Sequence, residues 1–256
     1  MLNLTEHNSQ KIIDLAVIVV CYNSEKTIRR CLDSIANQSC IPAELIIIDG
    51  ASSDNTLSIV SDFHALTTLV LSETDEGIYY AMNKGISLVT SNFFMFLNSD
   101  DYFKDSSSLK QYEIALNDPK VDLLFSNIRY VDDGKVTRVW DYHDAIGDTC
   151  VATRIPHPGA IVRKSVVQKV GYFNTDFKIA ADFDYFLRIL QQRITYKHIN
   201  YYTVDMEVGG ASDGNILSII KQNIEILRSV KLNGYGLLHM VHFLFDRLRF
   251  KLSQKV

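Results

Sequence analysis

The chain has 256 residues, of which 47% are hydrophobic and 22% are charged, and its formal net charge is −4. This length and composition are typical of a folded protein with one large domain, or slightly more, and a substantial core. The net negative charge argues against nucleic-acid binding, which normally requires a basic surface. No stretch approaches 18 consecutive apolar residues, so we expect no membrane-spanning helix.

The charge is unevenly distributed along the chain. Residues 217–256 contain seven Lys or Arg and two Asp or Glu, a net charge of +5, which leaves −9 for the 216 residues before them. The N-terminus lacks the basic start and apolar run of a secretion signal, and the four cysteines show no metal-binding spacing. We therefore expect a cytoplasmic protein with free thiols, an acidic body and a basic tail.

Short apolar runs alternate with helical patterns in the first hundred residues. We expect strands at 15–20, 45–48, 69–71 and 93–97, and helices at 25–37, just after 56, and at 77–89. This alternation predicts an α/β fold whose parallel sheet carries helices on both faces. We expect this nucleotide-binding half to cover about residues 15–104.

The pattern is less regular from 105 to 216, where we expect a smaller α+β region that shapes a second ligand site. Helices are expected at 107–116, 164–170 and 180–191, strands at 121–125, 160–162 and 195–199, and a hairpin at 128–140. Residues 141–153 are expected to form a loop. Gly209–Ser212 are expected to form another, and a lid over a bound substrate is one hypothesis for it.

The basic tail, 217–256, is expected to form two amphipathic helices separated by Asn233–Gly236. The second, at 237–252, would be about 24 Å long, shorter than the ~30 Å hydrocarbon core of a bilayer. Two interpretations remain open: the helix packs on the body or on a second copy of the chain, or it lies on an anionic membrane surface.

Each of the first four expected strands is followed by polar residues. These are Tyr22-Asn23, Asp49-Gly50, Asp75-Glu76-Gly77 and Asn98-Ser99-Asp100-Asp101. The carboxyl ends of parallel strands share one rim, where α/β sheets bind ligands. Acidic oxygens there suit a divalent cation that completes its shell with substrate phosphates. Turns and helix caps use the same residue types and are the alternative explanation.

Motifs that are missing narrow the choice of ligand. The first strand is not followed by G-x-G-x-x-G, and the chain has no G-x-x-x-x-G-K-[ST]. Its one G-x-S-x-G match, at 210–214, overlaps the expected loop at 209–212 and does not directly follow an expected strand. A dinucleotide site, a P-loop and an α/β-hydrolase nucleophile are therefore not supported. A diphosphate held through a metal by acidic residues remains.

Several segments together resemble the family-2 glycosyltransferases with a GT-A fold. They are VIVVCYNSEKTI, LIIIDGASSDNT, ETDEGIYYAMNKG, FFMFLNSDD, HPGAIVRK and GYFNTDFKIAADFDYFLRI, in the family's order between about Leu15 and Gly210. The resemblance implies inverting transfer of a sugar from a nucleotide-diphosphate donor, such as a UDP-sugar, to an acceptor hydroxyl. It also suggests a saccharide or lipid-linked acceptor in bacterial surface-polysaccharide assembly. No Q-x-x-R-W motif of the processive synthases is present.

By this resemblance, individual residues of the chain match the donor site of the family. The matching residues are Tyr22, Asn23, Glu25, Asp49, Asp75, Asn83, Lys84, Asn98 and Asp100. Among them, Asp49 matches the carboxylate that reads the nucleobase, and Lys84 is expected to face the diphosphate. A peripheral position at the inner face of the plasma membrane, through 237–256, would suit a lipid-linked acceptor.

Asn98-Ser99-Asp100 matches the family's Asp-x-Asp motif, with Asp100 as the expected ligand of Mn²⁺ or Mg²⁺. Asn98 replaces the first Asp, which removes one negative charge and makes it a better ribose or water-mediated contact than a metal ligand. Asp101 either compensates for this charge or caps the next helix.

Asp182 matches the family's catalytic base, although the acid that usually precedes it is Ala181 here. A positioned carboxylate can accept the proton that an attacking hydroxyl loses. His157 is an expected acceptor-side contact, with a structural role as the alternative. Two other functions stay open: a sugar-nucleotidyltransferase, and a module that binds a nucleotide-sugar without turnover.

Overall fold

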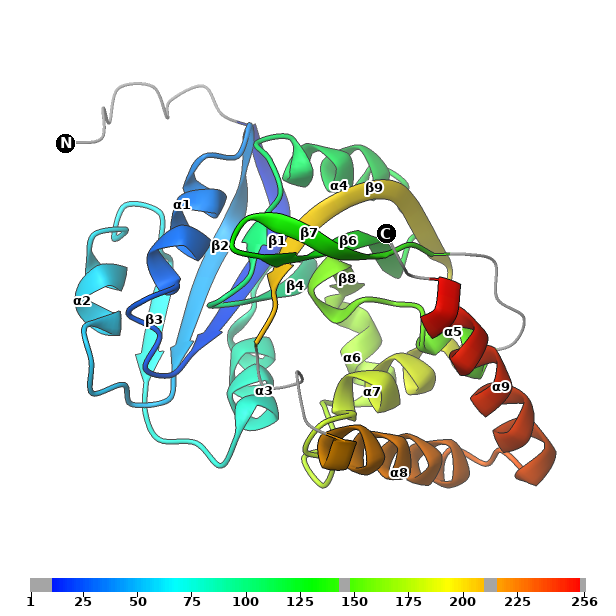
Figure 1. Cartoon of the computed structure of the whole chain (residues 1–256). Helices are drawn as coiled ribbons and strands as arrows, with labels where there is room; N and C mark the ends of the chain where they lie inside the picture. The colour runs from blue at the N-terminus through cyan, green and yellow to red at the C-terminus, as the bar shows by residue number, and fades with distance from the viewer. Residues whose placement is uncertain (1–10, 143–147, 210–215, 254–256) are drawn as a thin grey trace.

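The computed structural model describes residues 11–142, 148–209 and 216–253 of the chain (Figure 1). Apart from Gly209, the expected lid at 209–212 lies outside these residues. The described strands form one nine-stranded sheet in the order β3-β2-β1-β4-β8-β6-β9-β5, with β7 paired to β6. They are β1 (Lys11–Cys21), β2 (Cys40–Asp49), β3 (Leu69–Ser72), β4 (Phe93–Asn98), β5 (Tyr102–Phe103), β6 (Leu123–Asp132), β7 (Lys135–Trp140), β8 (Ala160–Arg163) and β9 (Tyr196–Glu207).

The first half of the sheet is parallel, as the sequence predicts. Strands β3, β2, β1 and β4 pair in that order, each parallel to its neighbour. Their register sets Cys21 beside Asp49, and Asp49 beside Ser72, while Asn98 lies beside Val20. The four strands therefore end on one rim, which is where the expected donor residues begin.

Helices cover both faces of the sheet (Figure 1). They are α1 (Ile28–Ala36), α2 (Thr56–Ser61), α3 (Ile78–Leu88), α4 (Ser108–Leu116), α5 (Asp148–Ala152), α6 (Lys164–Val170), α7 (Ala181–Leu190), α8 (Ile216–Leu232) and α9 (Leu237–Ser253). Successive residues of β1 alternate between two buried layers: Val17 and Val19 pack with α1, α2 and α4, and Ile18 and Val20 with α3, α6 and α7. The period of two explains why this strand is apolar throughout.

The structure differs from the expected outline in three places after β4. Residues 141–153 were expected to form a loop, but α5 occupies Asp148–Ala152. The strand expected at 195–199 continues to Glu207, and the short strand β5 was not expected. Pairing explains both, because β9 runs beside β6 from Tyr196 to Glu207 and also holds β5. Such partners lie far away in sequence and leave no local pattern.

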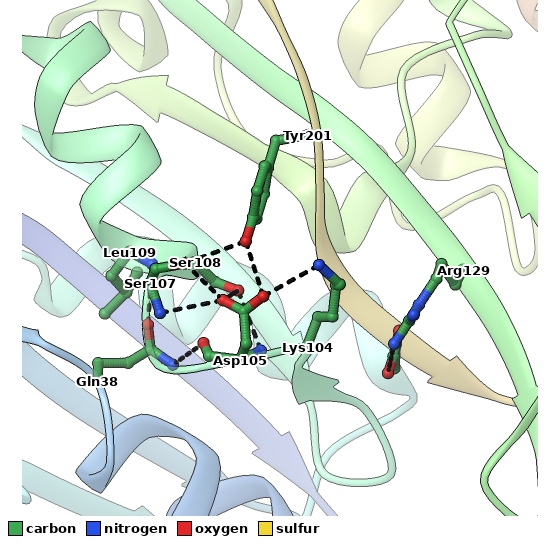
Figure 2. A network of polar contacts seen from close by, with 9 residues as sticks. Gln38, Lys104, Asp105, Ser107, Ser108, Leu109, Arg129 and Tyr201 are labelled. Carbon is green, nitrogen blue, oxygen red and sulfur yellow. Dashed lines mark hydrogen bonds and ion pairs between the residues drawn. The ribbon is translucent and has the colours of Figure 1, made fainter.

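A polar network around Asp105 joins the two halves (Figure 2). One carboxylate oxygen of Asp105 accepts hydrogen bonds from the Tyr201 hydroxyl at 2.7 Å and the Lys104 ammonium at 3.0 Å. The other oxygen accepts the backbone N–H of Ser107 at 3.0 Å, at the start of α4. These partners hold the pKa of Asp105 well below its usual range. Asp105 thus fixes β9 to the beginning of α4.

The C-terminal helices α8 and α9 lie along one side of the molecule, beside α7 and α5 (Figure 1). The contacts that fix α9 to the body include an ion pair between Arg154 and Asp246 at 2.7 Å and the rings of Phe183 and Phe243, which lie 5.6 Å apart. Helix α8 is fixed to α7, where the Ser229 hydroxyl donates to Asp184 at 2.7 Å. No helix among the described residues is both long enough and apolar enough to cross a membrane.

Candidate active site

Asp49 lies at the centre of the rim and is completely buried. Its carboxylate accepts hydrogen bonds from the Ser52 backbone N–H at 2.9 Å and from the Ser72 hydroxyl at 2.6 Å. The Cys21 thiol donates to it at 3.6 Å. The expected nucleobase contact is therefore bonded to protein groups on each side, and it holds the loop that follows β2.

Asn23 and Glu25 connect the loop after β1 to the loop after β2. The side-chain oxygen of Asn23, whose φ is +48°, accepts the backbone N–H of Ser53 at 2.9 Å. The Glu25 carboxylate accepts both the backbone and the side-chain N–H of Asn55, at 3.1 and 2.8 Å. These two expected donor residues shape the rim through loop-to-loop hydrogen bonds.

Tyr22 and Asp75 meet over Gly50, which was expected at the rim but was given no role there. A Cβ placed on Gly50 would lie 3.3 Å from the Tyr22 ring and 3.3 Å from a carboxylate oxygen of Asp75. The Tyr22 side chain is 66% exposed. The exposed face of the Tyr22 ring can stack on a flat polar ring, and the Asp75 carboxylate can accept a hydrogen bond from such a ring.

Asn83 and Lys84, on α3, bond to neighbouring segments of the chain. The Asn83 amide donates to the Phe173 carbonyl at 3.0 Å and accepts the Phe173 N–H at 2.9 Å, which clamps α3 to the segment before α7. The Lys84 ammonium pairs with Glu73 at 2.9 Å and donates to the Thr74 carbonyl at 3.1 Å. In this arrangement Lys84 braces the loop after β3.

Asn98, Asp100 and Asp101 follow β4 at the same rim. The Asn98 amide donates to the buried Asp101 carboxylate at 2.9 Å, while its own side-chain oxygen is buried and lacks a hydrogen-bond partner within the described ranges. Burial raises the pKa of Asp100, and the nearby Arg30 partly opposes this. Burial and the neighbouring Asp100 raise the pKa of Asp101 well above its usual range. A positive charge at this point would relieve the carboxylates.

Ser24 and Ser99 form a contact that the sequence did not reveal. Their hydroxyls lie 2.8 Å apart and connect the loops after β1 and β4. Ser24 directly precedes the helix expected at 25–37, but α1 begins at Ile28 and has no side-chain cap. The hydroxyl of Ser24 is used at the rim instead.

The donor set after β4 fits a hard divalent cation only in part. The described residues contain no cluster of three or more His, Cys, Asp or Glu side chains that could hold a metal. Mg²⁺ and related ions, however, are commonly held by one or two carboxylates together with substrate phosphates. The Asp100 carboxylate and the unpartnered Asn98 oxygen match such a minimal set.

Asp182 lies in the first turn of α7 and is partly buried, with its carboxylate accepting the Phe183 backbone N–H at 2.8 Å. Burial raises its pKa to about 6, although that N–H, Arg247 and Tyr79 partly oppose the increase. Tyr79 lies at the start of α3, shortly after Asp75, and its hydroxyl donates to the Ile179 carbonyl at 3.0 Å. The beginning of α3 thus adjoins both the loop that contains Asp75 and the carboxylate of Asp182.

Glu225 and Arg247 support Asp182 from the two C-terminal helices. The Glu225 carboxylate on α8 accepts the backbone N–H groups of Lys178, Ile179 and Ala180, at 2.8 to 3.1 Å. The Arg247 guanidinium on α9 lowers the pKa of Asp182 and donates to Asn223 at 2.7 Å. Neither residue belongs to a local motif, so no pattern in the sequence points to them.

His157 does not reach the rim. Its ring stacks on Phe96 with centroids 5.2 Å apart and is surrounded by aromatic side chains such as Phe173 and Phe186. Burial lowers its pKa to about 4, so the ring is neutral at physiological pH. Its Nε2 atom has no hydrogen-bond partner in the part of the chain that the structure describes. The ring thus packs in an aromatic, apolar environment, although the residue as a whole is only partly buried.

The sequence profile of a protein family described as "Glycosyl transferase family 2" matches residues 16–197 of the chain. The chain belongs to this family. The match spans β1 to the start of β9, and so contains the whole rim and Asp182. The expected resemblance is therefore confirmed.

Two curated relatives illustrate the range of the family. A PGL/p-HBAD biosynthesis glycosyltransferase of Mycobacterium tuberculosis is 27% identical over 206 residues, covering 77% of this chain and 78% of the relative. Hyaluronan synthase of Pasteurella multocida is 23% identical over 253 residues, covering 97% of this chain but only 26% of the synthase. As a family-2 glycosyltransferase, the chain is thus similar both to a protein of comparable length and to part of a much longer one.

Solved structures confirm the GT-A type of fold. TarS of S. aureus, in complex with UDP-GlcNAc, superimposes with a TM-score of 0.71 at 19% identity, covering 94% of this chain and 73% of TarS. The mannosyltransferase PcManGT of Pyrobaculum calidifontis, in complex with GDP-Man and Mn²⁺, gives a TM-score of 0.63 at 17% identity, covering 94% and 70%. The α/β architecture of the family-2 chain is therefore shared with both.

Proposed function

We propose that this glycosyltransferase is a metal-dependent, inverting enzyme that moves a sugar from a nucleotide-diphosphate donor to a hydroxyl of a lipid-linked saccharide. The observation that carries the proposal is the joint position of Asp75 and Asp182 at the start of α3, with Tyr79 beside the Asp182 carboxylate. A donor surface and a partly buried carboxylate with a raised pKa are what this reaction needs in one place. We place the reaction in bacterial surface-polysaccharide assembly, at the cytoplasmic face of the plasma membrane.

In this proposal the nucleobase of the donor lies over Gly50, between the Tyr22 ring and the Asp75 carboxylate. The aromatic face provides stacking, and the carboxylate accepts an N–H of the base, as uracil offers. The TarS complex with UDP-GlcNAc supports a UDP-sugar as the donor, because that structure shares the fold of this chain. Asp49 acts behind this surface and keeps the loop in shape.

A divalent cation, Mn²⁺ or Mg²⁺, would be held by Asp100. Asn98 was expected as a ribose or water-mediated contact, but its unpartnered side-chain oxygen would add a second, neutral ligand. When bound, such an ion neutralises the charge that develops on the departing diphosphate. The Mn²⁺ in the PcManGT complex supports this part of the proposal. The raised pKa of Asp100 is consistent with a carboxylate that gains from a positive partner.

Asp182 is the proposed general base. Its carboxylate accepts the proton of the acceptor hydroxyl while the hydroxyl oxygen attacks the anomeric carbon opposite the diphosphate, which inverts that carbon. A pKa of about 6 leaves Asp182 mostly ionised at pH 7, yet more basic than an exposed aspartate. The first turn of α7 and the Phe183 N–H hold the carboxylate in place.

The deciding experiment compares wild-type protein with Asp182→Asn on a panel of nucleotide-sugars with Mn²⁺ or Mg²⁺, measuring donor binding, donor hydrolysis and transfer. We expect the variant to bind the donor like wild type and to lose transfer. Asp176→Asn, an exposed aspartate, is the control and should transfer normally. Unchanged transfer by Asp182→Asn would remove Asp182 from its role. Donor binding by wild type without any turnover would favour the non-catalytic module.

A further inference from the structure

Helix α9 has two apolar faces, of which the body covers only one. Phe243 and Phe250 are buried. Val241, Leu244, Phe245 and Leu248 are 41% to 62% exposed, and their spacing of three and four residues places them in one stripe. The buried and exposed residues therefore mark opposite faces of the helix.

Helix α8 continues this pattern in its first half. Leu217, Ile220 and Ile224 are 65%, 48% and 60% exposed and also recur at spacings of three and four. Half of the exposed large hydrophobic side chains in the described part of the chain lie in α8 and α9. Such a concentration differs from the scattered apolar residues of an ordinary surface and marks an interaction site.

The acidic side chains of α8 and α9 contact the body of the protein, whereas several of their basic side chains are exposed to solvent. Both acidic side chains are used internally: Glu225 binds the loop before α7, and Asp246 pairs with Arg154. Basic side chains remain exposed beside the apolar residues, among them Lys221, Lys231 and Arg249. The outer surface is therefore apolar with a positive border, although the chain as a whole is negative.

We propose that α8 and α9 form a docking surface for an anionic lipid bilayer. Apolar side chains enter the boundary between headgroups and acyl chains, and basic side chains contact the anionic headgroups. Each helix has 17 residues, about 25 Å, so it lies along the surface and does not cross the membrane. A symmetric pairing of two copies through this surface would bring like charges together, which makes a second chain the less favourable partner.

The inner faces of the same helices hold the proposed base. Glu225 on α8 fixes the loop before Asp182, and Arg247 on α9 acts on Asp182 itself. Docking through the outer faces would thus place Asp182 about one helix diameter, roughly 10 Å, from the lipid surface. This step rests on the proposed function, because it explains how a lipid-linked acceptor reaches the base. The docking surface itself does not depend on it.

The test is co-sedimentation of the full chain with vesicles of phosphatidylcholine alone or with phosphatidylglycerol. We expect binding to the anionic vesicles that weakens as salt is added. The double variant Phe245→Ser/Leu248→Ser should bind at least about tenfold more weakly, since it removes two inserted side chains. Ile114→Ser, which changes a 57% exposed residue on α4, is the matched control and should bind like wild type.

A second variant addresses the charges. Lys221→Glu/Arg249→Glu should lose the preference for anionic vesicles while its melting temperature stays unchanged. Equal binding of wild type and the apolar double variant would overturn the proposal, and so would equal binding to both kinds of vesicle. A dimer in sedimentation velocity without lipid, lost in the apolar double variant, would identify a second copy as the partner instead. Nucleotide binding in solution, measured for every variant, separates failure of docking from failure of the proposed glycosyl transfer.

Discussion

The Glu225 carboxylate accepts the backbone N–H of Ala180 at 2.9 Å, two residues before the proposed base Asp182. The N–H groups of Lys178 and Ile179 bind the same carboxylate. A side chain on α8 thus acts as the anchor for the loop that leads into α7. The C-terminal helices are therefore part of the site and not an appendage to it.

Replacing this anchor should impair the reaction more than it impairs donor binding. Glu225→Ala leaves three N–H groups without their acceptor, which costs on the order of 1–3 kcal/mol of stability. A displaced Asp182 should lower kcat roughly 10- to 100-fold, with little change in nucleotide affinity. Steady-state kinetics and calorimetric titration with nucleotide measure the two effects. Glu225→Gln keeps one acceptor oxygen and should show a smaller loss; equal loss in both variants would argue against anchoring.

The rate should depend on pH through Asp182. Its pKa of about 6 lies above the usual range because of burial, so the base is protonated at lower pH and ionised at higher pH. Transfer should therefore fall about tenfold per pH unit below pH 6 and level off above pH 7. A rate that stays flat from pH 5 to 8 under chemistry-limited conditions would contradict the assignment.

A change at Arg247 tests whether the pH dependence of the rate arises from Asp182. Its positive charge lowers the pKa of Asp182, so Arg247→Gln should shift the acidic limb of the profile to higher pH. Loss of a structural contact alone would reduce the rate at every pH without moving the limb. Arg228→Gln, a change at an exposed arginine, is the control and should leave the limb in place.

Gly50→Ala should weaken donor binding while the protein stays folded. The added Cβ would lie 3.3 Å from both the Tyr22 ring and Asp75, so these side chains must move apart. We expect a loss of nucleotide affinity of about tenfold, corresponding to roughly 1.4 kcal/mol. Gly236→Ala, with open space around its Cβ, is the matched control. Nucleotide affinity equal to wild type would show that the donor avoids this surface.

Cation dependence should be lost when Asp100 is changed. Asp100→Ala removes the proposed ligand, so Mn²⁺ should no longer increase nucleotide affinity, and a chelator should have no further effect. Titration calorimetry with and without Mn²⁺ measures this difference. Asn98→Ala should retain part of the Mn²⁺ effect, since the asparagine adds only a neutral oxygen. A full Mn²⁺ effect in Asp100→Ala would exclude Asp100 as the ligand.

Asp105→Ala should lower the stability of the whole chain. It removes bonds to Tyr201, Lys104 and the start of α4, a loss of about 1–2 kcal/mol. The depressed pKa of Asp105 means that its contribution is present at neutral pH and is lost as the pH falls below about 4. The difference in unfolding free energy between wild type and variant should therefore shrink in acid. Asp176→Ala, an exposed aspartate with a 3.9 Å ion pair, should change little.

The parallel half of the fold could be predicted from local patterns. Apolar runs such as Leu45–Ile48 end in Asp49, and the pairing of Cys21, Asp49 and Ser72 follows once the strands lie parallel. The position of Asp182 at the start of a helix was also predictable. In each case the pattern of apolar and polar residues within one strand or helix was sufficient for the prediction.

The surroundings of the site could not be predicted in the same way. Asn83 binds Phe173, 90 residues away, and Glu225 binds Ala180, 45 residues away. The resemblance assigns Asn83 and Lys84 to the donor site, and the structure adds that both side chains hold neighbouring segments. Tertiary hydrogen bonds of this kind have no period along the chain, so only the folded structure reveals them.

Strand β4 is hydrogen-bonded to β1 on one side and to β8 on the other, so the same sheet passes beneath both halves of the molecule. A hinge between the halves would have to break the ladder from Phe93 to Met95. Capture of a substrate by closing two lobes, as in periplasmic binding proteins, is thus unavailable to this architecture. The spacing between the Tyr22 ring and Asp182 is set once, during folding. New acceptor preferences must therefore evolve through changes in the loops and the C-terminal helices, while the distance between the Tyr22 ring and Asp182 stays the same.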